Sequence, residues 1–441
     1  MVLSVALYQA ALSLAQPFVR LRARRRARGL PGEQDRLGER FGYAPLNAPR
    51  GAIWFHAVSV GEVIAIAPIV ARFANAHPRV PILVTTMTAT GAAEVVTRLG
   101  DRVVHAYAPY DFRDAVARFF DWLEPRLLVL VETELWPHWM NAAQARGVPV
   151  LVVNARLSAR SARGYRLGGA LVRNMLRGID HIACQYPAHA RRFAALGVAP
   201  DRLSVIGNVK FDAVPAEAVA ARAVLLRERY GFGVGPVWIA ASTHLGEEAR
   251  VLAAQRAIRK RLPGTRLILV PRHPSRALEV ADLCRATGVR FGWYSLASPA
   301  DSTAEVLLVD AIGVLLEHYA LAQVAFVGGS LVRAGGHNPI EPLQLGVPVV
   351  MGPHVFNFTD VVEYFEQDGV SGPLRRAESS TDLARVVGDW LADPGAARAA
   401  GGQGRDLAAH ARGASDRVLA LIESVFASRS SVKEIPAGER R

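Results

Sequence analysis

The regular alternation of two hydrophobic patterns, which begins at Gly51, constrains the fold of this chain most strongly. Short apolar runs of strand length alternate with longer stretches in which apolar residues recur every three to four positions, as on one face of a helix. This order is typical of β-α-β units and therefore of a parallel sheet. The alternation pauses near residues 209–214 and then resumes, so we predict two α/β domains.

The length agrees with this division, because 441 residues exceed what a single hydrophobic core usually organises. We expect one domain over residues 29–212 and a second over residues 213–427, ending in a helix at Arg405–Ala427 and followed by a polar tail at 428–441. The expected strands are Ala52–Ala57, Pro81–Thr85, Arg102–Val104, Leu127–Val131, Val148–Val153, Ile182–Gln185, Leu203–Ile206, Val237–Ala241, Leu267–Val270, Val306–Val309, Val324–Val327 and Val347–Met351.

The N-terminus combines an uncharged stretch, residues 1–19, with six arginines within residues 20–28. A cleavable signal peptide has its positive charge before the apolar run, so this order does not fit one. Arginines after the run predict that the N-terminus lies outside and the rest of the chain lies in the cytoplasm. We therefore expect residues 1–28 to form a membrane anchor whose arginines meet anionic lipid headgroups.

The anchor could take three forms. Residues 2–19 span ~27 Å as a helix, which is short for a single pass through a bilayer. An interfacial helix is the second form, since polar side chains share one face, and a helix packed on the soluble body is the third. The residues of that polar face are Gln9, Ser13, Gln16 and Arg20.

The net charge of +13 and the pI of about 10.4 indicate an acidic partner: nucleic acid, an anionic membrane or an acidic substrate. The sequence contains no RNP motif, zinc pattern or basic repeat, so we expect no nucleic acid. Cys184 and Cys284 are isolated, which is typical of buried thiols in a reducing cytoplasm.

The glycine-rich stretch at residues 325–352 predicts a ligand site at a strand's carboxyl end. Glycine pairs precede Asn338 and Pro339, which suit the N-cap and first position of a helix. Free N–H groups there would bind a phosphate, and the Glu341 carboxylate would accept hydrogen bonds from a ribose. The alternative is a well-capped helix in which Glu341 merely faces the helix dipole.

Three acidic residues follow predicted strands of the first domain. Ser59 and Glu62 have the spacing of a capping box, but Glu62 could instead act as a general base on a hydroxyl. Glu132 and Glu134 could belong to a site or serve as first-turn charges of the next helix. Because the chain turns there, we expect only one of these two in the site.

Basic and polar residues also follow strands. Lys210 could stabilise developing negative charge, and Arg272 could bind a phosphate or carboxylate with two hydrogen bonds. The loop at residues 154–158 could meet an anionic acceptor. His244 and His273 could coordinate a metal, but their spacing matches no recognised pattern, so we expect none.

Six motifs occur together: HAVSVGE at 56–62, ETELWP at 132–137, NARLS at 154–158, GNVKFD at 207–212, PRHP at 271–274, and FVGGS with GGHNPIEP within 326–342. With these motifs and GERFG at 38–42, the chain resembles the bacterial 3-deoxy-D-manno-octulosonic acid (Kdo) transferases of lipopolysaccharide synthesis. The resemblance runs from about residue 2 to about residue 425.

The resemblance implies a GT-B glycosyltransferase with two Rossmann-like domains facing a cleft. It implies inverting, metal-independent transfer of Kdo from CMP-Kdo to the lipid A precursor (lipid IVA), without a cofactor. Glu62 would be the general base, and Glu132 and Lys210 would support the transition state. The implied CMP-binding residues are Pro271, Arg272, Ile312, Gly313, Val314, Asn338, Pro339, Ile340 and Glu341.

One departure from the family pattern concerns donor binding: relatives often have Met-Gly-Glu where this chain has Ile312, Gly313 and Val314. The change matters little if the contacts are through backbone, and alters donor binding if the glutamate side chain makes them. The alternative function is that of another membrane-associated GT-B glycosyltransferase, which would use a UDP-sugar and a lipid acceptor.

Overall fold

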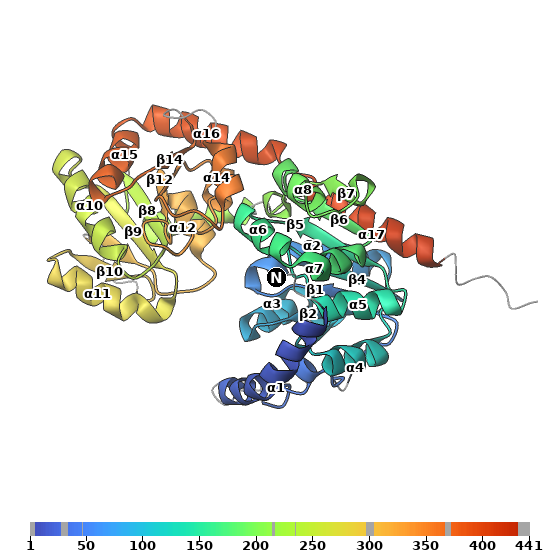
Figure 1. The fold of residues 1–441 in the computed structure, drawn as a ribbon. Helices are drawn as coiled ribbons and strands as arrows, with labels where there is room; N and C mark the ends of the chain where they lie inside the picture. The colour runs from blue at the N-terminus through green and yellow to red at the C-terminus, as the bar shows by residue number, and fades with distance from the viewer. Residues whose placement is uncertain are drawn as a thin grey trace, which may run out of the picture. The chain divides into compact units, whose positions relative to one another are not determined.

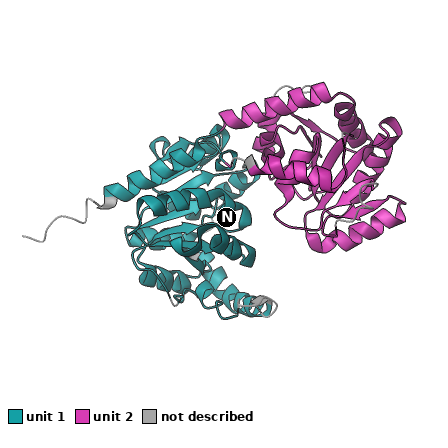
Figure 2. Cartoon of the chain, turned by 180° about the vertical axis from the view of Figure 1, so that it is seen from behind, with its two compact units in different colours: residues 1–212, 412–441 teal, residues 213–411 magenta. Residues whose placement is uncertain are grey.

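The structure, a computed structural model, describes residues 5–27, 34–45, 47–213, 217–233, 235–296, 304–366 and 372–430. The chain forms two compact units, of which unit 1 comprises residues 1–212 and 412–441 and unit 2 comprises residues 213–411 (Figure 2). In both units, helices cover a parallel sheet (Figure 1). The prediction of two parallel-sheet α/β domains is therefore confirmed.

The described part of unit 1 contains a sheet of seven strands in the order β3-β2-β1-β4-β5-β6-β7, with every neighbouring pair parallel. The strands are β1 (Ile53–His56), β2 (Ile82–Thr86), β3 (Val104–Tyr107), β4 (Leu127–Val131), β5 (Val150–Ala155), β6 (His181–Cys184) and β7 (Leu203–Val205). The helices are α1 (Val5–Ala27), α2 (Val60–Ala76), α3 (Ala89–Leu99), α4 (Arg113–Leu123), α5 (Pro137–Ala145), α6 (Ala159–Leu167), α7 (Gly169–Arg177), α8 (Pro187–Ala194) and α17 (Ala414–Ser430).

The described part of unit 2 contains a second parallel sheet, in the order β10-β11-β9-β8-β12-β13-β14. Its strands are β8 (Val237–Thr243), β9 (Arg266–Pro271), β10 (Phe291–Trp293), β11 (Val306–Leu308), β12 (Val324–Val327), β13 (Val349–Met351) and β14 (Leu374–Arg376). Its helices are α9 (Glu217–Arg229), α10 (Glu248–Arg261), α11 (Ala277–Ala286), α12 (Leu315–Leu321), α13 (Ile340–Gln344), α14 (Thr359–Phe365), α15 (Ser380–Ala392) and α16 (Pro394–His410).

The apolar runs form strands because both faces of each sheet are buried. In β1, Trp54 enters one core cluster of unit 1, whereas Ile53 and Phe55 enter the cluster on the opposite face. All three side chains are fully buried, which is typical of parallel strands covered by helices on both sides. Strand order reverses between β1 and β4 in unit 1 and between β8 and β12 in unit 2, and ligands favour the carboxyl ends of strands at such points.

Some strand predictions were wrong at the sheet edges. A strand was expected at Arg102–Val104, but Gly100–Arg102 form a 3₁₀ turn (η2) and β3 begins at Val104. Strands β10 and β14 were not predicted. Each has only three residues, and β14 includes two arginines, so neither carries a recognisable apolar run.

The C-terminal helix differs from the prediction because it is interrupted and returns to unit 1. Helix α16 ends at His410, and Gly413 adopts a left-handed conformation with φ of 92° before α17 begins. The Asp212 carboxylate accepts hydrogen bonds from the N–H groups of Gly413 (2.6 Å) and Ser415 (2.5 Å). Residues 412–427 therefore belong with unit 1, whereas we had expected them in the second domain.

Helix α17 belongs to unit 1 through its hydrophobic face. It packs along α2, and Val418 and Ile422 are fully buried in the unit 1 core (Figure 1). The helix continues to Ser430, so it ends later than the predicted Ala427. The rest of the predicted polar tail, residues 431–441, lies outside the described residues.

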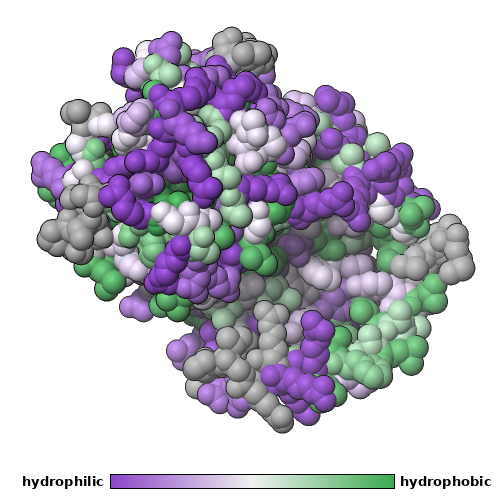
Figure 3. All heavy atoms as spheres, turned by 90° about the vertical axis from the view of Figure 1, so that its left-hand side faces the viewer, coloured by the Kyte–Doolittle hydropathy of each residue, from purple (hydrophilic) through white to green (hydrophobic). Residues whose placement is uncertain are grey.

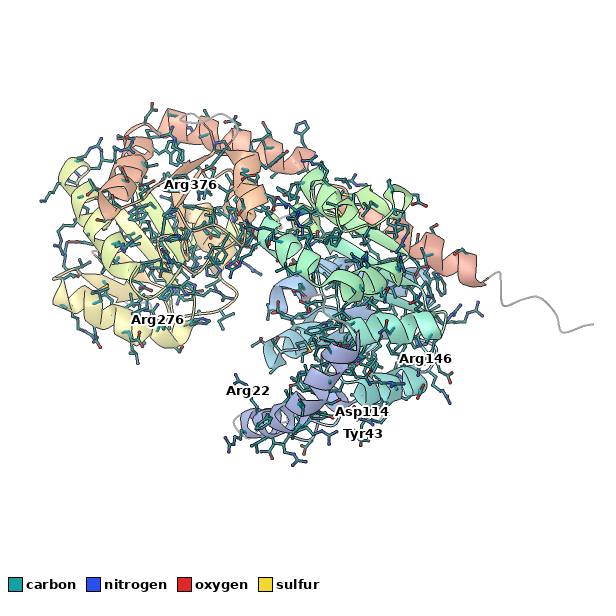
Figure 4. All side chains as sticks on the ribbon, in the orientation of Figure 1. Arg22, Tyr43, Asp114, Arg146, Arg276 and Arg376 are labelled. Atoms are coloured by element: carbon teal, nitrogen blue, oxygen red, sulfur yellow. The ribbon has the colours of Figure 1, made fainter. Side chains whose placement is uncertain are left out.

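None of the described helices, α1 among them, is long and apolar enough to cross a membrane. The polar face of α1 lies against α4, where Gln16 donates a hydrogen bond to Asp114 (3.3 Å) and Arg20 forms a 3.8 Å ion pair with the same carboxylate. Figure 4 labels Asp114 near α1. The Tyr8 hydroxyl also donates a hydrogen bond to Asp111 (2.8 Å). The helix is thus packed on the body of unit 1, as the third expectation stated.

The opposite face of α1 is apolar and exposed. Leu14 and Phe18 are 76% and 75% exposed, and Leu7 and Leu21 are also exposed. On the face shown in Figure 3, hydrophilic side chains are interspersed with hydrophobic ones. An apolar helix face beside a run of arginines is typical of a segment that binds a membrane surface.

Candidate active site

A cluster of charged side chains lies at the carboxyl edge of the unit 1 sheet. Glu62 belongs to the first turn of α2, which follows β1, and Glu132 directly follows β4. Lys210 lies in a 3₁₀ turn, Val209–Phe211 (η4), and its Nζ donates a hydrogen bond to Oε1 of Glu132 at 3.0 Å. The structure therefore brings together the three residues that were predicted to carry catalysis.

The Glu62 side chain makes a variant of the predicted capping box. Ser59 is the N-cap residue of α2, but its side chain makes no capping hydrogen bond. Glu62 reaches back and accepts a hydrogen bond from the N–H of Val58. A Cβ atom placed on Gly61 would meet no atom within 4 Å, so the helix surface at Gly61 is open.

The surroundings of Glu62 suit proton transfer near neutral pH. Burial, followed by the negative charges of Glu132 and Glu134, raises the pKa of Glu62 to about 8, against the opposing effects of the Val58 N–H and Lys210. A carboxylate with a pKa in this range is a stronger base than an ordinary glutamate, whose pKa is near 4.5. Shifted pKa values of this kind are frequent at active sites.

The negative charge of Glu134 also raises the pKa of Glu62. We had expected only one of Glu132 and Glu134 to belong to the site. The Glu134 carboxylate accepts a hydrogen bond from Trp136 Nε1 at 3.1 Å, and burial raises its pKa. Its charge in turn raises the pKa of Tyr165 on α6, although burial of the phenol is the larger cause. The turn after β4 therefore places both carboxylates close enough to Glu62 to raise its pKa.

Buried amides position Lys210, and sequence reasoning missed this role. The backbone N–H of Lys210 donates a hydrogen bond to Asn208 Oδ1 (3.0 Å), and the N–H of Val209 donates one to Asn154 Oδ1 (3.2 Å). Asn154 adopts a left-handed backbone conformation with φ of 52°, and Glu132 adopts one with φ of 63°. Such conformations are costly outside glycine and are concentrated at functional sites.

The second cluster lies at the carboxyl edge of the unit 2 sheet and surrounds Arg272. Its backbone N–H donates a hydrogen bond to Thr243 O (2.9 Å), which holds the residue beside the end of β8, and its side chain is exposed. Pro271 is the last residue of β9 and is buried. The side chain of Arg272, which was predicted to bind phosphate, is therefore exposed, and its backbone is held by a hydrogen bond.

Three histidines accompany Arg272. Nε2 of His244 and Nε2 of His337 are 2.7 Å apart, so one donates a hydrogen bond and the other accepts it. The ring of His273 stands edge-on to that of His244, with centroids 6.4 Å apart. Burial and then the charge of Arg272 lower the pKa of His337 to about 4. The His337 imidazole is therefore neutral at neutral pH, and Arg272 supplies positive charge beside it.

The buried carboxylate of Glu247 organises the glycine-rich loop. Its two oxygens accept hydrogen bonds from the N–H groups of His244 (2.9 Å), Gly329 (2.7 Å), Ser330 (3.0 Å) and Leu331 (2.8 Å). We had expected free N–H groups in this loop to bind a phosphate. That expectation was wrong for these groups, because a carboxylate from a neighbouring strand-to-helix turn already occupies them.

The helix after the loop begins one residue later than predicted. The N-cap of α13 is Pro339, and the helix has only five residues. Asn338 Oδ1 nevertheless accepts a hydrogen bond from the N–H of Ile340 (3.1 Å), and its Nδ2 donates one to Glu341 Oε1 (3.0 Å). Burial raises the pKa of Glu341, whose half-buried carboxylate remains a candidate acceptor for sugar hydroxyls.

The segment Ile312, Gly313 and Val314 leads into α12. Ile312 is 85% exposed, and Gly313 has φ of 84°, which favours glycine. Helices α12 and α13 are in contact, which connects this segment to Glu341. Across the described ranges, no group of three His, Cys, Asp or Glu side chains is arranged to hold a metal ion.

Comparison with solved structures identifies the class of fold. A crystal structure of UDP-N-acetylglucosamine 2-epimerase from Neisseria meningitidis, bound to UDP-GlcNAc, matches 85% of this chain and 100% of that chain with a TM-score of 0.58. At 12% sequence identity, this likeness concerns the fold alone. The chain thus has the two-domain α/β fold that is also found in nucleotide-sugar epimerases.

Comparison with sequences identifies the family. A family model described as 3-deoxy-D-manno-octulosonic-acid transferase (kdotransferase) matches residues 35–213. A 3-deoxy-D-manno-octulosonic acid transferase from Haemophilus influenzae is 37% identical over 89% of this chain and 92% of that protein. One from Bordetella pertussis is 35% identical over 94% and 98%, respectively. The chain belongs to the 3-deoxy-D-manno-octulosonic acid transferase family and is a glycosyltransferase.

Proposed function

We propose that this protein transfers Kdo from CMP-Kdo to a hydroxyl of the lipid A precursor. The observation that carries the proposal is the cluster of Glu62, Glu132 and Lys210, in which an acidic side chain with a raised pKa lies near a second carboxylate and its paired cation. Identity to Kdo transferases over nearly the whole chain supports the substrates.

Glu62 is the general base in this proposal. Its carboxylate takes the proton of the acceptor hydroxyl as the oxygen attacks the anomeric carbon of Kdo. The bond from that carbon to the phosphate oxygen breaks, and CMP leaves with the electron pair. Because attack comes from the side opposite the leaving group, a single displacement inverts the anomeric centre.

Lys210 and Glu132 act as a unit that supports the transition state. Their 3.0 Å hydrogen bond holds the ammonium group at the carboxyl edge of the sheet, where it offsets developing negative charge. The side chains are only 25% and 19% exposed, so the interaction is screened less than one on the surface.

The donor nucleotide binds to unit 2 in this proposal. Arg272 binds a phosphate oxygen through its guanidinium group, and Glu341 binds ribose hydroxyls. Pro271, Asn338, Pro339 and Ile340 shape the site, together with the 312–314 segment. The cations Arg272 and Lys210 supply positive charge, so the proposed reaction is metal-independent and a chelator should leave its rate unchanged.

We also propose that α1 binds the cytoplasmic face of the inner membrane as an interfacial helix. The exposed apolar face, with Leu14 and Phe18, would enter the headgroup region, and the neighbouring arginines would meet anionic lipids. This arrangement brings a lipid acceptor to unit 1, which carries Glu62.

The decisive experiment incubates the purified protein with CMP-Kdo and the lipid A precursor and weighs the products by mass spectrometry. We expect a mass increase by one or more Kdo units. Parallel reactions contain UDP-sugars in place of CMP-Kdo, or a chelator. Turnover of UDP-sugars without turnover of CMP-Kdo would overturn the assignment of the donor.

A further inference from the structure

A hollow lined by three arginines lies between α6 and α8 of unit 1. Arg163 and Arg166 project from α6 and Arg192 from α8, around a floor that includes Ala162 and Leu196. The volume of the hollow is about 270 Å³, and small alanine side chains keep it open. The NARLS motif connects β5 to α6, and its Leu157 carbonyl oxygen accepts a hydrogen bond from Arg192, one of the three lining arginines.

The guanidinium group of Arg192 is held in place by neighbouring polar atoms, whereas Arg163 and Arg166 are exposed. Nη1 of Arg192 donates a hydrogen bond to the carbonyl oxygen of Leu157 at 2.8 Å and lies 3.2 Å from Nδ1 of the buried His189. Within the part of the chain that the structure describes, no carboxylate forms an ion pair with Arg163, Arg166 or Arg192. Three uncompensated guanidinium groups around one space favour a multiply charged anion.

Helix α6 connects this hollow to the candidate base. Tyr165, which lies between the two arginines in the sequence, is half-buried against the unit 1 core and is close enough to Glu134 for that carboxylate to raise its pKa. The charge of Glu134 in turn raises the pKa of Glu62. The Ser158 hydroxyl fixes the start of α6 by accepting a hydrogen bond from the N–H of Ser161 (3.0 Å).

We propose that this hollow binds a phosphate monoester of the acceptor substrate. Arginine recognises phosphate through paired hydrogen bonds, and three guanidinium groups match its charge and its several oxygens. The hollow belongs to the unit that carries Glu62, whereas the proposed donor site belongs to unit 2, so its ligand comes from the acceptor. This inference rests on the proposed function and adds to it a site that selects phosphorylated acceptors.

The test compares the double variant Arg163→Ala/Arg166→Ala with Arg160→Ala/Arg173→Ala, which removes the same charge from exposed positions outside the hollow. With detergent-dispersed lipid A precursor, we expect the first variant to raise the acceptor KM at least tenfold, with the CMP-Kdo KM and kcat changed less than twofold. With an acceptor that lacks phosphates, the difference in acceptor KM between this variant and wild type should be smaller. The control variant should resemble wild type.

Two further measurements separate the alternatives. In a titration followed by NMR, a sugar 1-phosphate should bind the wild-type protein and should not bind Arg163→Ala/Arg166→Ala. Because this measurement needs no turnover, it tests the hollow even if the protein does not transfer Kdo. If Arg163→Ala/Arg166→Ala and Arg160→Ala/Arg173→Ala raised the acceptor KM equally, the proposal would be overturned, because the arginines would then act only through net charge. An unchanged acceptor KM with lost binding to vesicles of phosphatidylglycerol would overturn it in favour of lipid headgroups.

Discussion

Glu62 shares the carboxyl edge of the unit 1 sheet with two further carboxylates and one lysine. Burial and the neighbouring negative charges favour its protonated form, whereas the Val58 N–H and Lys210 favour the charged form. Since the pKa settles near 8, the free protein at neutral pH holds a proton on Glu62. Substitution of Glu62 should therefore change the pH dependence of both catalysis and stability.

The first prediction concerns catalysis. Glu62→Gln should lower kcat by about 10²- to 10⁴-fold, because general base catalysis typically contributes that much. In wild type, kcat/KM should rise with pH and level off above pH 8, since the base must lose its proton first. Ser59→Ala is the control, because the Ser59 side chain makes no capping hydrogen bond. A flat pH profile from 6 to 9 in wild type would contradict the assignment.

The second prediction concerns stability. The pKa of Glu62 in the folded protein, about 8, lies above its ordinary value of 4.5. The group therefore contributes stability that is fully present below pH 4.5 and is lost as the pH rises through 8. Glu62→Gln should unfold at a higher denaturant concentration than wild type at pH 9, and this gap should narrow at pH 5. An equal gap at both pH values would show that the carboxyl is not shifted.

The third prediction concerns Glu247. In Glu247→Gln, an amide NH₂ replaces one oxygen and faces two backbone donors, each of which costs about 1–3 kcal/mol when left without an acceptor. Amide hydrogen exchange at Gly329, Ser330 and Leu331 should accelerate, and CMP should bind more weakly. The control is Glu279→Gln, because Glu279 is exposed and pairs only with Arg276 at the surface. Unchanged exchange at these three amides would refute the organising role.

Among the elements, α1 shows that two faces of one helix can serve different partners. The side chains of Tyr8, Gln16 and Arg20 contact Asp111 and Asp114 on unit 1. The other face carries exposed leucines and Phe18. Because the polar face is occupied by the protein, the apolar face is the one available to a membrane.

The fourth prediction tests this face. Leu14→Ser/Phe18→Ser should reduce cosedimentation with vesicles that contain phosphatidylglycerol, because each substitution removes apolar area from the membrane-binding face, at ~25 cal/mol per Å². Transfer to a detergent-dispersed acceptor should change little. Gln9→Ser/Ser13→Ala, on the side toward α4, is the matched control. Undiminished vesicle binding of the first variant would exclude a membrane role for this face.

At the scale of the whole molecule, the chain leaves unit 1 at Asp212 and re-enters it at Arg412. Asp212 marks both crossings, since its carboxylate accepts hydrogen bonds from the first residues of α17. The last helix then supplies buried side chains to the unit 1 core. Unit 1 is therefore incomplete without residues that lie 200 positions further along the sequence.

The fifth prediction concerns this closure. Asp212→Ala should lower the free energy of unfolding of unit 1 by about 0.5–2 kcal/mol, as expected for the loss of a helix cap. Hydrogen exchange in α17 and α2 should accelerate, and exchange in the unit 2 sheet should stay unchanged. Asp416→Ala, which removes only a surface ion pair with Arg72, is the control and should cost less. Equal acceleration in both units would contradict the division into two units.

Local sequence determined the repeating elements of this protein. Apolar runs such as Leu127–Val131 are long enough and uninterrupted enough to form buried strands, and the motifs after them place Glu62, Glu132 and Arg272 at strand ends. These features depend on neighbours within a few residues. For that reason the two α/β domains and the residues at the sheet edges could be predicted without coordinates.

Only the tertiary structure decided which partners these residues meet. The hydrogen bond from Lys210 to Glu132 joins residues 78 positions apart, and Glu247 binds a loop more than 80 positions away. The return of α17 to unit 1 spans a still larger separation. Contacts between distant positions arise when the sheets assemble and bury polar groups that must find partners, and no pattern within a short window of sequence encodes that choice.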